Sequence, residues 1–581
     1  MIEQVPPGLI LILGALLVPL LSGRVRQLYM LALPGVALVY CWLIPVGTTL
    51  DLVLFDYTLE LIRVDKLSRI FGIIFCLAAL LSVIYALHED DPVQEVSALM
   101  YSGSAVAAAF VGDLISLFVF WEATAITSVF LIWARRTERA YKTGMRYLAI
   151  QVASGVLLLA GTLLHYNATG SLAFGTAWTE GAVPGMFAFE TLADASPGAL
   201  LIFLSFGIKA AFPLLHNWLQ DAYPEATVTG AVWLSAFTTK LAIYALARGF
   251  AGTDILIPIG AAMAAFPIFF AVIENDLRKV LAYSLNNQLG YMVVGVGIGT
   301  ELALNGTASH AFAHILYKGL LFMSMGAVLY RAGTVNGSEL GGLWRSMPWT
   351  TTFCIIGAAA ISAFPLFSGF VSKSMILSAA AEEHHTLTFL VLLFASAGVF
   401  HHSGIKIPYF AFFAHDSGKK VQEAPRNMLV AMGGAAFLCI AIGCYPQPLY
   451  DLLPFDMQAL QWVPYDMTHV VTTLQLLLFS ALAFVFLQKT GLYPPELRSI
   501  NIDTEIVYRK WLPGLVSFLQ HLLGGLADRL RATLRSWLER SVDRVGVWHS
   551  PAGLLGEPWP IGLAALWAGI LLFLFLLLSY L

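Results

Sequence analysis

Charged residues are scarce in this 581-residue sequence. They make up 12% of it, whereas a soluble domain carries about 25%. Hydrophobic residues make up 58%, and the mean hydropathy is +0.77. At roughly 20 apolar residues per spanning helix, the chain has room for about fifteen spans. The sequence therefore predicts an all-α polytopic membrane protein and excludes a soluble enzyme with a single anchor.

Basic charge, paired cysteines and a cleavable leader are also missing. The net charge of −4 leaves no basic face for nucleic acid. The first apolar run follows an acidic segment and lacks an A-x-A cleavage site, so we expect it to remain as the first span. The cysteines lie in apolar stretches without the C-x-x-C spacing of an iron–sulfur or zinc site, so we expect no redox centre in this chain. They are Cys41, Cys76, Cys354, Cys439 and Cys444. We likewise expect the chain to hold no cofactor, no metal and no catalytic site of its own.

Apolar runs of spanning length recur along the whole chain, and each predicts a transmembrane helix. We expect spans near residues 8–23, 27–46, 67–87, 94–112, 113–134, 143–165, 198–219, 228–250, 254–274, 281–300, 307–330, 350–375, 386–412, 428–446, 469–488 and 559–580. Between the second and third spans, residues 52–62 alternate apolar and polar side chains, a pattern typical of a short β-hairpin.

The Lys and Arg residues of the short loops predict the orientation. Odd-numbered loops through the thirteenth hold Arg24, Arg26, Arg135, Arg136, Arg139, Lys142, Arg146, Arg278, Lys279, Arg331, Arg345, Lys419, Lys420 and Arg426. Even-numbered loops through the fourteenth hold only Arg63, Lys66, Arg69 and Arg248. We therefore expect the odd-numbered loops in the cytoplasm and the N-terminus and the hairpin outside.

Two stretches of the sequence resemble each other. Residues 209–221 and 361–373 share Ala-Phe-Pro-Leu and lie five spans apart. An odd number of spans between two copies gives them opposite orientations, as in transporters with inverted repeats and broken helices. Pro213 and Pro365 each remove a backbone hydrogen bond, so we expect a helix break at each.

Several ionisable side chains lie inside the expected spans. An ionised group at the centre of a span costs about 2.5–3.5 kcal/mol, which makes each one a functional candidate. Glu122 lies near the middle of the fifth span and needs a cationic partner, for which Lys209, one turn before Pro213, is the natural choice. Lys240 lies mid-span in the eighth; a buried lysine can lose its proton near neutral pH, whereas arginine stays charged. The alternative is that Glu122 and Lys209 form a static structural pair.

Histidine and lysine also follow one face of the eleventh span. His310, His314 and Lys318 are spaced i, i+4 and i+8, which predicts a stripe suited to a proton wire. The thirteenth span holds the weaker candidates His402 and Lys406, and Lys406 is close enough to the cytoplasmic end to snorkel. No carboxylate or thiol is spaced to complete a metal site with these histidines.

The chain changes character after the fifteenth span. From residue 505 to residue 545, leucines recur at three- and four-residue steps beside arginines, a pattern that predicts an amphipathic helix on the cytoplasmic face. We expect Gly524-Gly525 to bend or break this helix, and the last span follows it. The helix anchors to lipid or braces a neighbouring subunit, and the sequence leaves both open.

These residues together resemble the antiporter-like subunits shared by Mrp-type cation/proton antiporters, respiratory complex I and membrane-bound hydrogenases, most closely the D-type Mrp protein. The resemblance spans roughly residues 60–420. It rests on Trp121-Glu122, Lys209, the stretch from His216 to Glu225, Lys240, the stretch from Asp276 to Ser284, the stretch from His314 to Lys318, and the stretch from Gly369 to Lys373. Two departures are Gln220, where relatives commonly have proline, and Asn286-Asn287-Gln288, where they have small hydroxylated residues.

The resemblance implies a core of about fourteen helices with two inverted five-helix repeats. It divides the chain into N-terminal spans with the hairpin (1–93), the first repeat (94–250), the second repeat (251–415), two further spans (416–490) and a C-terminal helix with a last span (491–581). It also implies a proton-translocating axis through Glu122, Lys209, Lys240, His314, Lys318 and Lys373. We add His310 to this axis from the stripe on the eleventh span, and His216, His402 and Lys406 as weaker candidates.

The implied function is that of one subunit of a multi-subunit Na⁺/proton antiporter in the cell (inner) membrane. The expected partners are other membrane subunits, protons, Na⁺ and lipid. Three alternatives remain: a proton-pumping subunit of a complex I-like or hydrogenase complex, a subunit of a CO₂ or bicarbonate uptake complex, and a membrane scaffold whose buried charges only hold subunits together. Only in a redox complex would the chain act as part of an enzyme.

Overall fold

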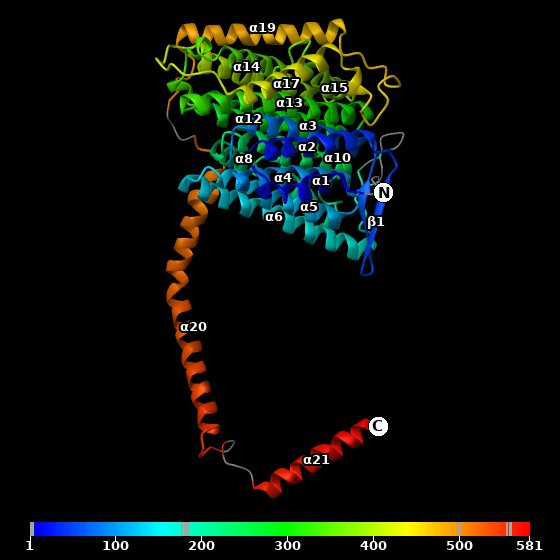
Figure 1. The fold of residues 1–581 in the computed structure, drawn as a ribbon, viewed down its shortest axis with the longest axis vertical. Helices are drawn as coiled ribbons and strands as arrows, with labels where there is room; N and C mark the ends of the chain where they lie inside the picture. Colours follow the sequence, from blue (N-terminus) through cyan, green and yellow to red (C-terminus); the bar gives the residue numbers. More distant parts are fainter. Residues whose placement is uncertain are drawn as a thin grey trace. The chain divides into compact units, whose positions relative to one another are not determined.

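The computed structural model describes residues 5–175, 178, 185–497, 501–553, 556 and 560–580. The chain divides into two compact units, residues 1–501 and 502–581. The first unit is a bundle of helices that lie side by side, with one β-hairpin at an end of the bundle (Figure 1). Among the described residues, eleven helices are long and apolar enough to cross a membrane. The expected all-α polytopic fold is confirmed.

The N-terminal half of the bundle follows the expected spans. Its elements are α1 (Pro7–Ala15), η2 (Val18–Leu20), α2 (Gly23–Leu43), β1 (Thr49–Leu54), β2 (Tyr57–Arg63), α3 (Lys66–Ala86), α4 (Pro92–Phe110), α5 (Leu114–Trp133), α6 (Glu138–Thr169), α7 (Pro197–Ala210), α8 (Asn217–Ala222), η3 (Tyr223–Glu225), α9 (Gly230–Ala236) and α10 (Thr238–Phe250). The strands pair antiparallel, as the alternating pattern predicts. Side-chain caps start several helices: Asp65 accepts from the Ser68 amide, and Asp113 from the Ser116 amide.

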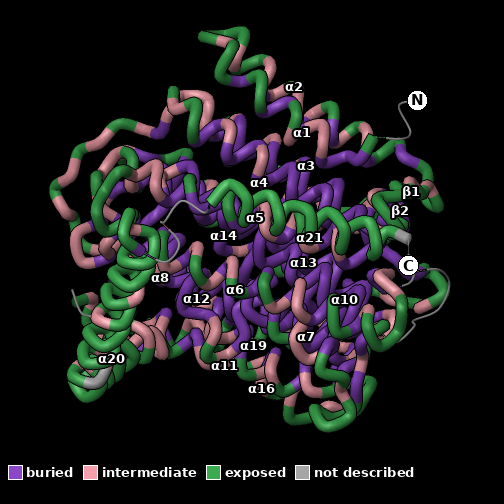
Figure 2. Tube along the Cα trace, turned by 90° about the horizontal axis from the view of Figure 1, so that it is seen from below, coloured by how far each residue is buried: buried purple, intermediate pink, exposed green. Residues whose placement is uncertain are grey.

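The C-terminal half continues the bundle. Its elements are α11 (Leu256–Ile273), α12 (Leu277–Ile298), α13 (Glu301–Ala332), η4 (Gly337–Glu339), η5 (Leu343–Arg345), α14 (Pro348–Ile361), α15 (Ser368–Glu382), α16 (Thr386–Val399), η6 (Phe400–Lys406), η7 (Tyr409–Phe413), α17 (Arg426–Cys444), α18 (Gln447–Tyr450) and α19 (Met467–Thr490). The elements η6 and η7 are π-helices, so the thirteenth span widens in its second half. Helices α10 and α13 form the buried centre of the bundle (Figure 2).

Two spans are interrupted by the same backbone conformation. Between α7 and α8, Ala211 and Leu214 have positive φ angles of 62° and 71° on either side of Phe212-Pro213. Between α14 and α15, Ala363 and Leu366 have φ angles of 57° and 74° on either side of Phe364-Pro365. Positive φ is strained for residues other than glycine. The shared Ala-Phe-Pro-Leu stretch thus forms the same break twice.

Two short backbone pairings, each ahead of a helix, also match. The Leu114 amide donates to the Leu172 carbonyl, and the Phe174 amide to the Gly112 carbonyl. In the other half, the Leu277 amide donates to the Val335 carbonyl, and the Gly337 amide to the Asn275 carbonyl. The first pairing joins the start of α5 to the chain that follows α6, and the second joins the start of α12 to the chain that follows α13. The five-span segments that hold them remain predicted repeats, and these local matches agree with that prediction.

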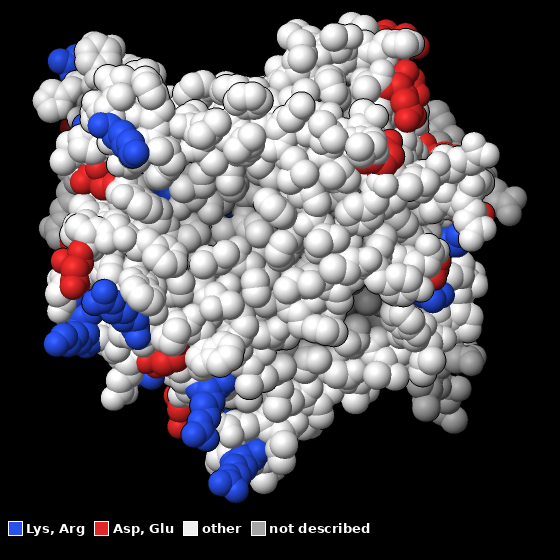
Figure 3. Space-filling model, turned by 90° about the horizontal axis from the view of Figure 1, so that it is seen from above, with Lys and Arg blue, Asp and Glu red and all other residues white. Residues whose placement is uncertain are grey.

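The outer face of the bundle is suited to lipid. Seen from above in Figure 3, Lys, Arg, Asp and Glu side chains lie at two opposite ends of the molecule, and the broad middle between them shows none. Charged groups at the centre of a bilayer are costly, whereas those at its two surfaces are hydrated. The bundle therefore presents an apolar band between two polar ends.

The second unit holds η8 (Val507–Trp511), α20 (Leu512–Trp548) and α21 (Ile561–Tyr580). A break at Gly524-Gly525, one of the two outcomes expected there, is wrong, because α20 runs through both glycines for 37 residues. A glycine inside a helix costs only about 1 kcal/mol relative to alanine, and the flanking leucines and arginines favour the helix. At 1.5 Å per residue, α20 is about 55 Å long.

Candidate functional site

Helices α5 and α7 bring Glu122 and Lys209 to one region of the bundle. Lys209 is fully buried, and its Nζ donates to the Trp121 carbonyl (2.6 Å) and to the Thr124 hydroxyl (3.1 Å). The ammonium also lies 4.4 Å from the centre of the Trp121 ring, a cation–π contact. Lys209 thus binds the turn of α5 that carries Glu122.

Glu122 itself points elsewhere. Its side chain is half-buried, and its carboxylate lies against Gly155 of α6, where an added Cβ would come within 1.5 Å of Oε1. The two charges interact electrostatically. The expected direct ion pair is not formed: none within 4.0 Å joins Glu122 to Lys209 in the described structure. The carbonyl and ring of Trp121 hold the ammonium instead.

Lys240 lies at the break between α9 and α10. Its Nζ donates to the Ser235 carbonyl (2.5 Å) and the Thr239 hydroxyl (3.2 Å), and the side chain is fully buried. Tyr101 of α4 completes the break: its hydroxyl is 2.6 Å from Thr238 Oγ1 and accepts from the Thr238 amide. A helix interruption thus supplies the acceptors for a buried lysine.

The stripe on α13 lies inside a connected polar network. His310 Nδ1 is 3.1 Å from the Ser372 hydroxyl on α15, and His310 Nε2 is 3.4 Å from the Tyr317 hydroxyl. Tyr317 in turn donates to Gln288 of α12 (3.1 Å), and Gln288 donates to Asn287 (2.6 Å). All five side chains are fully buried. The network joins three helices across the centre of the second half.

His314 and Lys318 lie beside this network and are fully buried. Neither the ring nitrogens of His314 nor the Nζ of Lys318 has a hydrogen-bond partner among the described residues. His314 interacts electrostatically with Lys240, Lys318, His310 and Lys373. It therefore lies between the lysine of the first half and those of the second.

Lys373 of α15 lies at the second break. Its Nζ donates to the Ile361 carbonyl (3.1 Å), at the last residue of α14, and lies 5.0 Å from the centre of the Tyr291 ring. The side chain is 1% exposed. Lys240 and Lys373 thus share one arrangement, in which a buried ammonium binds a carbonyl next to a helix interruption.

The weaker candidates on the thirteenth span are buried as well. The expectation that Lys406 snorkels is wrong, because its side chain is fully buried and forms an ion pair with Glu496 at 2.9 Å. The π-helix η6 turns the lysine inward, toward the last carbonyls of α11. His402 Nδ1 is 2.9 Å from the Ser403 hydroxyl, which donates to Ser284 of α12 (2.7 Å).

His216 lies at the end of the first break, immediately before α8. It is buried, and its ring packs edge-on against Phe266 with 4.6 Å between the ring centres. Gln220 continues α8 without interruption. The opening of this span therefore rests on residues 211–216, which include Pro213.

Arg248, expected in a loop, lies in the last turn of α10 and forms a buried ion pair that the sequence does not predict. Arg248 and Asp65 are each 2% exposed, and the guanidinium binds both carboxylate oxygens at 2.8 and 2.9 Å. Arg248 Nε also donates to the Tyr244 hydroxyl (2.8 Å). The pair joins the start of α3 to the end of α10. Its partners are 183 residues apart, and only the fold brings them together.

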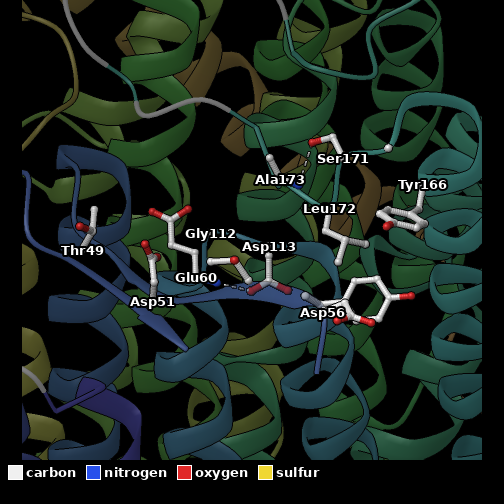
Figure 4. A pocket seen from close by; sticks show the side chains of 13 residues that line it. Thr49, Asp51, Asp56, Glu60, Gly112, Asp113, Tyr166, Ser171, Leu172 and Ala173 are labelled. Atoms are coloured by element: carbon white, nitrogen blue, oxygen red, sulfur yellow. Dashed lines mark hydrogen bonds between the residues drawn. The ribbon is translucent and has the colours of Figure 1, made fainter. Parts of the chain in front are cut away.

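An acidic pocket of about 520 Å³ lies at the hairpin end of the bundle. Figure 4 shows Asp51, Asp56 and Glu60 of the hairpin segment facing Asp113, with Tyr166 opposite. Asp113 accepts from the Glu60 amide, and Glu60 pairs with Arg63. The structure thus gives this end of the bundle a negative, solvent-open surface. Across the described residues, no group of three or more His, Cys, Asp or Glu could hold a metal ion.

Comparisons with known proteins agree with this architecture. The family model described as "NADH:quinone oxidoreductase/Mrp antiporter, TM" matches residues 111–400, which hold all the axis residues. Hydrogenase-4 component B of Escherichia coli is 29% identical over 439 residues, or 67% of this chain and 63% of that protein. The D-type subunit of the Na(+)/H(+) antiporter of Alkalihalophilus pseudofirmus is 29% identical over 353 residues, or 58% of this chain and 70% of that protein.

Among solved structures, a chain of the Mrp complex from Dietzia sp. matches with a TM-score of 0.68 and 20% identity. The match covers 80% of this chain and 98% of that one. At this identity the likeness shows the fold alone. The chain spans less than two thirds of the hydrogenase-4 relative, so the activity of the whole relative does not transfer with the match.

Proposed function

Because the chain belongs to the family of antiporter-like membrane subunits that Mrp antiporters, respiratory complex I and membrane-bound hydrogenases share, we propose that it translocates protons along its buried lysine and histidine axis. One observation carries the proposal. Lys209, Lys240, Lys318 and Lys373 are all at most 1% exposed. Such a series is costly in a merely structural role, because each charge must be compensated in a low-dielectric interior.

The proposed path starts at Glu122 and Lys209 and continues through Lys240. From there it passes His314 and the network around His310 to Lys373. The interrupted helices support this path, since each break offers carbonyl acceptors to a lysine while leaving the ammonium free of a fixed carboxylate partner. When the Glu122 carboxylate moves relative to Lys209, the lysine gains or loses a stabilising charge and its proton is driven along the axis. Movement against a membrane potential requires about 2.3 kcal/mol per charge per 100 mV, so a partner must drive it.

We further propose that the chain is one subunit of a multi-subunit complex in the cell membrane. Its solved structural neighbours are parts of membrane complexes. The positive residues of the odd-numbered loops support a cytoplasmic position for those loops, with the N-terminus and the acidic hairpin pocket outside. The paired helix breaks and the two matching backbone pairings support residues 94–250 and 251–415 as inverted repeats.

For the driving reaction, exchange of Na⁺ for protons is the first candidate, by likeness to the Alkalihalophilus pseudofirmus antiporter protein. A redox-driven pump is the second, because the hydrogenase-4 component covers more of this chain. Vesicles from the native membrane separate the two: addition of NaCl collapses a preformed pH gradient in the first case, and an electron donor builds a gradient in the second.

The test of translocation is Glu122→Gln, which removes the charge at nearly constant volume. We expect the rate of pH change in native vesicles to fall about 100-fold, the usual cost of losing a positioned proton-transfer group. Glu138→Gln is the matched control, because Glu138 is exposed and pairs only with Lys142 of its own helix. Equal rates for wild type and Glu122→Gln, at equal amounts of protein, would remove Glu122 and the proposed axis from the mechanism.

A further inference from the structure

The segment that follows α19 packs against η6 and against the connection between α11 and α12. Tyr493 lies 5.6 Å from the His401 ring and 5.3 Å from the Phe484 ring, measured between ring centres. Asn501 Nδ2 donates to Glu274 Oε2 at 3.1 Å. Glu496 lies between these two contacts in the sequence. The segment therefore places a carboxylate where the thirteenth span ends its π-helix.

Glu496 meets Lys406 of η6 there. Its carboxylate is 6% exposed, and Oε1 lies 2.9 Å from Lys406 Nζ, which is fully buried. Lys406 also donates to the Val272 and Glu274 carbonyls, both at 2.7 Å, at the end of α11. Glu496 Oε2 has no hydrogen-bond partner among the described residues. One oxygen thus faces the ammonium while the other is left to accept a proton.

Glu274, a second carboxylate near Lys406, already has hydrogen-bond partners. Its Oε1 accepts from the Asn275 and Asp276 amides, and its Oε2 from Asn501 and from Lys279 at 3.1 Å. Both oxygens of Glu274 thus already accept hydrogen bonds from other groups, whereas Glu496 faces Lys406.

We propose that Glu496 is a proton-transfer group at the cytoplasmic end of the axis and exchanges its proton with Lys406. This inference rests on the proposed function. The ammonium gives one proton to the carboxylate, which leaves a neutral amine and a neutral carboxylic acid, and the acid then releases the proton to water. The transfer within the pair creates no net charge. Release to water leaves a carboxylate beside a neutral amine, until a proton arriving along the axis charges Lys406 again; in the opposite direction, Glu496 takes a proton from water and passes it to the amine.

The charges around Glu496 suit the transfer. Lys406 faces it from η6 and Glu274 from the α11–α12 loop. Lys279, in the first turn of α12, pairs with Glu274, and the His401 ring lies against the Tyr493 ring. Burial raises the pKa of Glu496, and so does the nearby Glu274, whereas Lys406 lowers it; the net direction is upward. A carboxylate with a raised pKa binds and releases protons closer to neutral pH than an exposed one.

The experiment compares variants of the full chain in native membrane vesicles. Glu496→Gln should slow the pH change about 100-fold, and Glu496→Asp should restore most of the rate with a shifted pH profile. The double variant Lys406→Met with Glu496→Leu removes both charges and leaves no unpaired ion in the interior. We therefore expect this variant to fold but not to transport protons. Glu138→Gln, which breaks an exposed Glu–Lys pair, is the matched control.

Two outcomes would overturn the inference: a wild-type rate and pH profile in Glu496→Gln, or full transport in the double variant, since either makes the pair a structural contact only. If Glu496→Gln does not accumulate, the Asp variant decides, and an unshifted profile overturns the proposal. Failure of the proposed function itself looks different, because Glu122→Gln would then transport as fast as wild type.

Discussion

The Arg248–Asp65 pair should stabilise the fold without carrying protons. Arginine stays protonated in proteins, and this guanidinium is held by two contacts to Asp65 and one to Tyr244. Arg248→Met leaves Asp65 ionised and 2% exposed, and breaking a buried pair in this way costs about 3–5 kcal/mol. The double variant Arg248→Met with Asp65→Asn should recover most of that loss, because the amide oxygen still accepts from the Ser68 amide that starts α3.

Unfolding of the purified full chain in detergent measures the stability, and vesicle pH change measures transport. Arg139→Met is the control: Arg139 is 80% exposed and pairs with Glu225 at 2.7 Å, so we expect a loss of at most about 1 kcal/mol. Folded protein that carries Arg248→Met should transport at the wild-type rate. The reasoning is refuted if Arg248→Met is as stable as Arg139→Met, or if it abolishes transport at unchanged stability.

Two further predictions concern side chains of the axis itself. Gly155→Ala should lower the transport rate about tenfold or more, because the added Cβ would displace the Glu122 carboxylate. Gly35→Ala is the control and should have no effect, because a Cβ added there meets no atom within 4 Å. Equal transport rates for the two variants would refute the placement of Glu122. Lys318→Met should abolish transport while leaving the unfolding temperature unchanged or higher, since Nζ is buried without a hydrogen-bond partner in the described structure. Lys420→Met, at an exposed position, is its control, and a strongly destabilised Lys318→Met would mark that lysine as structural.

Local patterns predicted most of the fold. Apolar runs marked the spans, alternation marked the hairpin, and the prolines of two similar stretches marked the broken helices, because each feature depends on neighbouring residues. The cost of placing a charge in lipid likewise marks Lys209, Lys240 and Lys373 as functional candidates from the sequence alone. Their acceptors at the breaks were not predictable, because they depend on how each helix end turns.

Contacts between distant segments stayed hidden. Glu496 follows Lys406 by 90 residues and lies outside any span, so nothing local marks it as the partner of that lysine. Charge alone predicts a direct Glu122–Lys209 pair, but the Trp121 carbonyl and ring compete for the ammonium, and that contact depends on how α5 and α7 pack. The glycines of α20 were overrated as helix breakers because their cost is small against the helix preference of their neighbours.

The most direct test of the account is proton movement through Lys240, which lies between the two halves of the axis. Lys240→Met removes a buried charge and nearly keeps the length of the side chain. Lys142→Met makes the same substitution at an exposed lysine. The account predicts that native vesicles with Lys240→Met, at wild-type protein levels, change pH about 100-fold more slowly than vesicles with Lys142→Met. Equal rates for the two variants would contradict it.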